Sequence, residues 1–118
     1  KTYLYWGLTL AMDGKPKAAI KKYEKVVELE AENSNAYAYW GAALEQLGDH
    51  SGAIGKLEHA LEIMPNNNNV FNTLIDALVN LKKYNEAWEV VKKARKARVA
   101  ISSKLLSKLA EVFPEPIL

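Results

Sequence analysis

The chain has 118 residues, of which 49% are hydrophobic and 25% are charged, and its formal net charge is +2. These values are typical of one soluble globular domain. The absence of cysteine excludes a disulfide framework, a thiolate zinc site and a cysteine nucleophile. No apolar run approaches the roughly 18 residues that cross a bilayer, and no signal-peptide pattern opens the chain.

Helical periodicity begins with the first residues. Apolar side chains recur at three- and four-residue spacing from Tyr3 onward, which is the spacing of one face of an α-helix. Gly14, Gly48 and Pro65 with the asparagines that follow it interrupt the pattern. The sequence predicts helices over residues 2–13, 16–30, 34–47, 50–63, 68–81, 84–98 and 102–113. Because the periodicity starts at once and residue 1 is not methionine, we expect a piece of a larger protein.

The same pattern recurs with a constant offset of 34 residues, so that Trp6 returns as Trp40 and Gly14 as Gly48. Further correspondences at this offset are Tyr3, Tyr37 and Phe71; Leu10, Leu44 and Leu78; Ala19, Ala53 and Ala87; and Tyr23, Leu57 and Val91. Self-similarity of this kind indicates a helical repeat protein, in which stacked units bury a continuous core.

Helix-turn-helix units of 34 residues with these small and aromatic positions resemble the tetratricopeptide repeat. The second unit matches best, through Tyr37, Trp40, Gly41, Leu44, Gly48, Ala53, Leu57, Ala60 and Pro65. The resemblance implies an all-α fold, a right-handed α-α superhelix of about seven helices, in a single domain over residues 1–118. We expect repeats over 1–33, 34–67 and 68–101, then a closing helix over 102–113. Gly7, Gly41 and the alanines of the pattern are expected where paired helices approach closely.

The third repeat departs most from the pattern. Ile75 replaces its small residue, Lys82 replaces its turn glycine, and Val99 replaces the proline that ends repeat two. Terminal repeats are often atypical because one face lacks a neighbour. In the helix that follows, one side is formed by Leu105, Leu106, Leu109, Val112 and Phe113, and Pro114 ends it. We expect this helix to cover the apolar flank of repeat three.

In tetratricopeptide repeats the first helix of each unit lines the concave surface, so the resemblance implies a set of partner-binding residues. These are Leu4, Tyr5, Leu8 and Met12 in repeat one; Asn35, Tyr39, Ala42 and Gln46 in repeat two; and Asn69, Asn72, Asp76 and Asn80 in repeat three. The groove therefore changes from apolar and aromatic to amide-rich, and it suits an extended or helical peptide. Alternatively, Leu4, Tyr5 and Leu8 cover another repeat that precedes the first.

One subgroup of the family clamps the C-terminal carboxylate of heat-shock chaperones with lysine, arginine and asparagine side chains. The corresponding positions here are Leu4, Leu8, Tyr39, Asn69 and Thr73. None of them is a cation, and an anionic terminus needs charge-assisted donors. The sequence therefore argues against a chaperone-tail adaptor.

Three other features favour structural explanations. Residues 82–108 contain nine basic and two acidic side chains, but no aromatic residues interleave the cations as in many nucleic-acid sites, which favours a solvated helix face. We interpret His50 and His59 as solvated helix residues, and Trp6, Trp40 and Trp88 as core residues.

No nucleophile-base set, phosphate loop or dinucleotide motif appears, so the sequence predicts a domain that is not an enzyme and binds no cofactor or metal. The first hypothesis is a protein–protein interaction scaffold that holds a peptide or protein on its concave face. The alternatives are a substrate-presenting arm of a larger enzyme, such as a glycosyltransferase, and a structural module that self-associates through its N-terminal helix. Nucleic acid is not favoured as a partner. No feature indicates a compartment, and the cytoplasm is only a default expectation.

Overall fold

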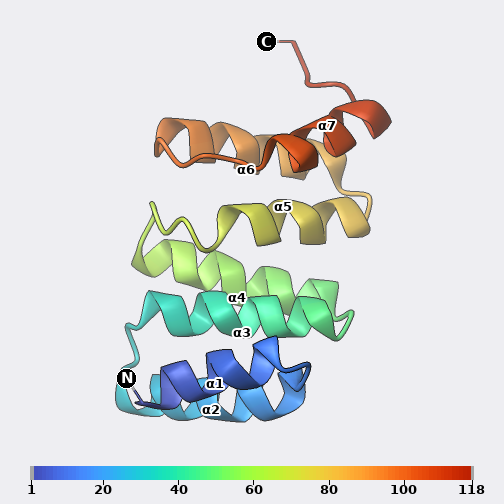
Figure 1. The fold of residues 1–118 in the computed structure, drawn as a ribbon. Helices are drawn as coiled ribbons and strands as arrows, with labels where there is room; N and C mark the ends of the chain where they lie inside the picture. The colour runs from blue at the N-terminus through green and yellow to red at the C-terminus, as the bar shows by residue number, and fades with distance from the viewer. Residues whose placement is uncertain (1, 118) are drawn as a thin grey trace.

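The computed structural model describes residues 2–117, and this part of the chain contains α-helices and no strand. The helices are α1 (Thr2–Met12), α2 (Pro16–Leu29), α3 (Ser34–Gln46), α4 (His50–Ile63), α5 (Phe71–Asn80), α6 (Tyr84–Lys96) and α7 (Ser103–Val112). The predicted all-α class is confirmed, while residues 1 and 118 of the predicted domain lie outside the described residues. Figure 1 shows the helix pairs α1/α2, α3/α4 and α5/α6 stacked in chain order along the long axis of the molecule, whose extents are 44 × 25 × 20 Å, with α7 at the end of the stack. None of these helices combines the length and the hydropathy that crossing a bilayer requires.

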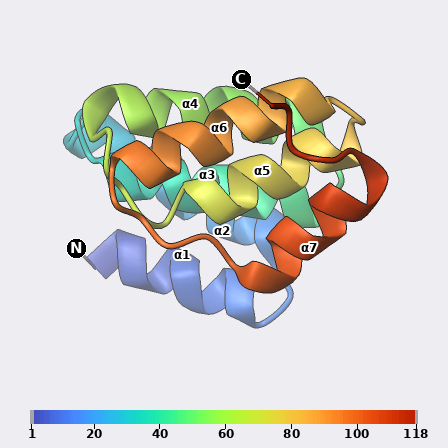
Figure 2. The ribbon, with the colours of Figure 1, turned by 90° about the horizontal axis from the view of Figure 1, so that it is seen from above.

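Contacts between helices that are not consecutive in the chain lie along one side of the stack. Each helix from α1 to α5 packs against the next one in the chain, but α3 also contacts α1 and α5, and α5 contacts α7. Over residues 2–117, no comparable contact joins α2, α4 and α6 to one another. A stack whose units meet more closely along one side curves toward that side. We call α1, α3, α5 and α7 the inner row and α2, α4 and α6 the outer row; Figure 2 shows α7 continuing the inner row beside α5.

Helix α5 begins at Phe71, whereas the sequence predicted a start at residue 68. The Asn67 backbone N–H donates to the Met64 carbonyl over 3.1 Å, and the Asn67 side-chain oxygen accepts from the Asn69 backbone N–H over 2.9 Å. Asparagine side chains that bond to nearby backbone in this way compete with helix formation. Residues 65–70 therefore form turns, and the helix starts later.

Two glycines mark the close approach of paired helices, as the repeat pattern predicted. A Cβ atom added at Gly7 would lie 2.6 Å from a ring carbon of Tyr23, and one added at Gly41 would lie 2.6 Å from Cγ of Leu57. Real Cβ atoms do not approach other atoms so closely, because interiors are already densely packed. Glycine at these positions thus sets the spacing between α1 and α2 and between α3 and α4.

The buried core divides into two unequal parts. The larger part runs from Ala38 and Leu57 through Leu74 and Val91 to Leu109, and it joins repeats two and three to α7. The smaller part surrounds Ala19, Tyr23 and Ala43, and it joins α1, α2 and α3. Most of the apolar burial that stabilises the fold is therefore in the C-terminal two thirds of the chain.

Helix α7 covers repeat three as predicted, with one exception. Leu109 is fully buried, and Leu105 and Leu106 pack against the larger part of the core. Val112, which the sequence placed on the same side, is 55% exposed. It is the last residue of α7, and the ring of Phe113 packs instead, with its centroid 5.7 Å from that of Tyr84.

The three tryptophans differ in burial, so the prediction that all belong to the core is wrong for Trp6. Trp88 is only 7% exposed, and its indole N–H donates to the Phe113 carbonyl over 2.8 Å. Trp40 is half-buried and packs against the smaller part of the core. Trp6 is 49% exposed, because within residues 2–117 no repeat stacks in front of α1. The Lys22 ammonium lies 3.6 Å above its ring centroid.

Tyr23 carries a buried hydroxyl that has no hydrogen-bond partner among the described residues. Burial, with a smaller contribution from Tyr39, raises the pKa of this phenol to about 12. Tyr23→Phe is expected to increase the free energy of unfolding at neutral pH by about 1 kcal/mol, since it removes an unpaired buried polar group. Denaturant unfolding followed by circular dichroism would measure the change.

The same phenol gives a pH dependence with a definite sign. An unfolded tyrosine ionises near pH 10, whereas folded Tyr23 resists ionisation up to about pH 12. The wild-type chain should therefore lose stability relative to Tyr23→Phe as the pH rises from about 10 toward 12. Tyr5→Phe, at an exposed position, is the matched control. A difference between wild type and Tyr23→Phe that stays constant over this pH range would contradict the assignment.

Candidate functional site

An open cavity of about 520 Å³ lies on the inner row, between α3, α5 and α7. It is lined by Ala42, Glu45, Gln46, His50, Asn72, Thr73, Asp76, Asn80, Ser102 and Leu105. Residues three and four apart share one face of a helix, so the spacing of Ala42, Glu45 and Gln46 aims three side chains of α3 at it. The same spacing applies to Asn72, Asp76 and Asn80 in α5. The structure thus brings together five of the predicted groove residues, namely Ala42, Gln46, Asn72, Asp76 and Asn80.

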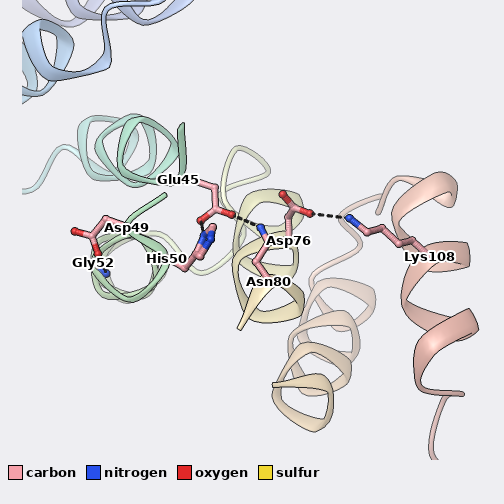
Figure 3. Close-up of polar contacts among 7 residues, drawn as sticks. All are labelled: Glu45, Asp49, His50, Gly52, Asp76, Asn80 and Lys108. Atoms are coloured by element: carbon pink, nitrogen blue, oxygen red, sulfur yellow. Dashed lines mark hydrogen bonds and ion pairs between the residues drawn. The ribbon is translucent and has the colours of Figure 1, made fainter. Parts of the chain in front are cut away.

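Glu45 links three helices at one end of this cavity. One of its carboxylate oxygens lies 2.8 Å from His50 Nδ1 and the other accepts a hydrogen bond from Asn80 Nδ2 over 2.7 Å, as Figure 3 shows. The Glu45 side chain is only 12% exposed. His50, predicted to be solvated, is therefore partly buried against a carboxylate. No motif in the sequence indicated this pair, because it depends on how the turn between α3 and α4 brings the two residues together.

Two further contacts connect α7 to the cavity. The Asn72 side-chain oxygen accepts from the Ser102 backbone N–H over 2.9 Å, just before α7 begins. The Lys108 ammonium lies 3.9 Å from an Asp76 oxygen, with both side chains largely exposed (Figure 3). An exposed pair of this kind contributes little to stability. The closing helix therefore forms one wall of the cavity in addition to covering repeat three.

A cluster of asparagine side chains, which we call the amide cluster, lies on the inner row near the N-terminal ends of α3 and α5. Asn67 is fully buried, and its Nδ2 donates to Ser34 Oγ over 2.8 Å and to Asn35 Oδ1 over 2.9 Å. Asn69 Nδ2 donates to the same Asn35 oxygen over 3.1 Å. The predicted binding residues Asn35 and Asn69 are thus held by each other and by Asn67. Sequence reasoning missed Asn67, although a run of four asparagines after Pro65 was a signal that one of them would be buried.

The predicted residues of repeat one, and Tyr39 of repeat two, lie apart from the cavity. Leu4 and Tyr39 pack against the smaller part of the core. Leu8 is half-buried, whereas Tyr5 and Met12 are exposed on α1. The inner row therefore has apolar side chains in its N-terminal part and the polar cavity in its C-terminal part.

The cavity has a definite electrostatic character. Its lining contains the carboxylates of Glu45 and Asp76 and several amide and hydroxyl groups, and it includes no lysine or arginine. Such groups accept hydrogen bonds from main-chain N–H groups or cations and offer little to an anion. Between residues 2 and 117, no cluster of three or more His, Asp or Glu side chains is arranged to hold a metal ion.

Comparisons with known proteins agree with the repeat pattern. The family model described as "Tetratricopeptide repeat" matches residues 34–67. A mutant of MamA is 28% identical in sequence, with a TM-score of 0.73 over 81% of this chain and 70% of its own. The Sgt2 tetratricopeptide domain from Aspergillus fumigatus is 20% identical, with a TM-score of 0.82 over 94% of this chain and 74% of its own.

A third solved structure is the first tetratricopeptide domain of Spaghetti (RPAP3) bound to the HSP90 peptide SRMEEVD. It is 16% identical, with a TM-score of 0.85 over 94% of this chain and 87% of its own. At these low identities, the Sgt2 and Spaghetti structures establish the fold alone. No curated protein sequence matches the chain.

Proposed function

Since this chain is a tetratricopeptide repeat array, we propose that it is a protein-interaction scaffold that holds a peptide or protein partner along its inner row. The observation that carries the proposal is the cavity of about 520 Å³ between α3, α5 and α7. Five of the residues expected from the repeat pattern to face a partner line this cavity. A peptide that lies along the inner row would enter it without rearrangement of the helices.

The chemistry of the cavity supports a neutral or cationic segment of the partner. The Spaghetti structure holds the HSP90 peptide SRMEEVD, which is rich in carboxylates. In this chain the lining of the cavity contains Glu45 and Asp76 and no lysine or arginine, and Lys108 offsets the charge of Asp76 only, so an acidic tail would meet like charge at Glu45. The exposed apolar side chains of Tyr5 and Met12 in α1 would contact an apolar part of the same partner.

We assign the cavity a binding role and not a catalytic one. Its polar side chains are engaged with protein groups: Glu45 with His50 and Asn80, Asn72 with the Ser102 backbone, and Asp76 with Lys108. Such cross-links between helices preorganise a surface for recognition. They do not present a nucleophile to a base at a reacting atom.

Thr73→Arg tests the proposal at the centre of the cavity. Thr73 is half-buried in its lining, so a long cationic side chain there would fill the cavity and reverse its charge. Proteins captured by the wild-type chain from an extract of its source organism should be lost or bind at least about tenfold more weakly, a change of about 1.4 kcal/mol. Quantitative mass spectrometry of the captured proteins would measure it.

Asn85→Arg is the matched control, since it introduces the same side chain at an exposed position of the outer row. Circular dichroism of both variants would confirm that the helices are intact. If Thr73→Arg and Asn85→Arg capture the same proteins in the same amounts as the wild type, the inner-row cavity is not the binding site.

A further inference from the structure

A second cleft, of about 460 Å³, opens on the outer row near the ends of α4 and α6. We call it the outer cleft; it is lined by Leu61, Pro65, Phe71, Lys93, Lys96 and Ala97. Leu61, Pro65, Phe71 and Ala97 give it apolar walls, and Phe71 is only 1% exposed. In Figures 1 and 2, α4 and α6 end on the same side of the stack, away from α7. The outer cleft is therefore separate from the inner-row cavity and shares no lining residue with it.

The cations of α6 divide between two sides of the helix. Arg95 binds the C-terminal segment, with Nη1 2.6 Å from one Glu115 oxygen and Nη2 3.4 Å from the other. Lys92 lies on that side too, because it lines a small cavity together with Glu115. Lys93 and Lys96 face the outer cleft instead and form no ion pair within residues 2–117. Glu115 thus pairs with one cation on its side of α6, while Lys93 and Lys96 remain available at the outer cleft.

A polar cleft of about 500 Å³ adjoins the outer cleft at Ala97. It is lined by Asn66, Asn68, Asn69, Ala97, Arg98, Val99 and Ala100. Asn66, Asn68 and Arg98 are exposed there. Amide side chains and a guanidinium can bind the main-chain carbonyls and the carboxylates of an extended peptide. The outer cleft, with its apolar walls and its two lysines, thus continues into a polar cleft that is lined by hydrogen-bond donors.

We propose that the outer cleft binds an extended acidic segment of a protein that carries one bulky aliphatic side chain. The aliphatic side chain would enter between Leu61 and Ala97, and flanking carboxylates would pair with Lys93 and Lys96. Residues 82–108 contain nine basic and two acidic side chains, so the surrounding field attracts such a segment. The pairing of Arg95 with Glu115 shows that a single carboxylate on a non-helical stretch of chain already binds a cation on the opposite side of α6.

The lining favours a peptide over a nucleic acid. Nucleic-acid grooves combine cations with exposed aromatic rings on which bases stack. The aromatic ring in this cleft belongs to Phe71, which is 1% exposed and has no face available for a base. An aliphatic side chain can instead fill the apolar part of the outer cleft, and its burial contributes to the binding free energy through the hydrophobic effect.

Calorimetric titration with the synthetic peptide Gly-Asp-Glu-Leu-Asp-Glu-Gly, blocked at both ends, tests the proposal. Binding should weaken with added salt, and amide NMR signals of Leu61, Lys93 and Ala97 should shift on titration. Replacing the leucine of the peptide by serine should weaken binding several-fold. Lys93→Glu combined with Lys96→Glu should weaken it at least about tenfold. Lys82→Glu combined with Lys83→Glu, the same charge change at exposed sites near the start of α6, should change it by less than about twofold.

Thr73→Arg separates this inference from the proposed function, because blocking the inner-row cavity should leave binding of the acidic peptide unchanged. The inference fails if the peptide binds the two charge-reversal variants equally, or if the serine peptide binds as well as the leucine peptide. It also fails if an oligouridine binds more tightly than the peptide and with the same sensitivity to Lys93 and Lys96, since the occupant would then be a nucleic acid.

Discussion

Asn67→Leu is expected to lower the free energy of unfolding by about 3 kcal/mol. The leucine side chain has the same number and branching of heavy atoms as that of asparagine, so the change removes polar contacts without opening a cavity. Three hydrogen bonds would be lost: two from the Asn67 amide to Ser34 and Asn35, and one from the Asn69 backbone to the Asn67 oxygen. Each is worth about 1 kcal/mol net, and a buried partner left unpaired costs more.

Urea denaturation followed by circular dichroism would measure this loss. Asn68→Leu is the matched control, since Asn68 is exposed and exposed substitutions usually change stability by less than about 0.5 kcal/mol. Equal effects of the two substitutions would mean that the buried amide cluster does not stabilise the junction between repeats two and three.

The second large effect is expected where α3 and α4 meet. Leu57→Ala should destabilise the chain by about 3 kcal/mol, because Leu57 is fully buried in the larger part of the core and its truncation leaves a cavity. Gly41→Ala alone should also destabilise, by about 1–2 kcal/mol, since the new Cβ atom would lie 2.6 Å from Leu57 Cγ. In the Leu57→Ala background the clash with the leucine side chain is removed and the Ala53 carbonyl oxygen, 3.1 Å from the added Cβ atom, is the next nearest atom, so Gly41→Ala should there be close to neutral.

The double-mutant cycle of Gly41→Ala and Leu57→Ala is therefore expected to give a coupling free energy of about 1–2 kcal/mol. Gly55→Ala is the control for helix propensity: nothing lies within 4 Å of a Cβ atom added there, so it should stabilise the chain by about 0.5–1 kcal/mol. Additive effects of Gly41→Ala and Leu57→Ala would show that the two residues do not determine the spacing between the helices.

The positions of the helices could be predicted from the sequence because the pattern of apolar residues that indicates them recurs in each repeat. The apolar faces recur in all three repeats at the offset of 34 residues, and the turn glycine recurs from Gly14 to Gly48, so an error in one repeat would conflict with the next. The start of α5 was wrong by three residues, since the number of turn residues after Pro65 depends on which asparagine becomes buried. Asn67 is the buried one because its side chain donates to Ser34 and Asn35, which lie more than 30 positions away in the sequence.

The candidate site was predictable in part. The resemblance to the tetratricopeptide repeat implied five residues that line the cavity, namely Ala42, Gln46, Asn72, Asp76 and Asn80. The pairing of Glu45 with His50 and Asn80 was not predictable, because it joins three helices whose relative rotation comes from packing. The exposure of Trp6 was missed for a related reason: the residue holds the same repeat position as Trp40, and the sequence pattern does not record whether a neighbouring repeat covers it.

Because the three tryptophans are buried to different degrees, the intrinsic fluorescence of the chain can report on its repeats separately. Trp6, Trp40 and Trp88 belong to successive repeats, and their exposure falls from 49% for Trp6 to 7% for Trp88. Indole emission moves to shorter wavelength as water is excluded, so the red edge of the spectrum comes mainly from repeat one and the blue edge from repeat three. Trp88 also donates to the carbonyl of Phe113 just beyond α7, so the blue component reports whether the closing helix is docked. Variants that keep a single tryptophan would thus resolve events at the two ends of the array without any added label.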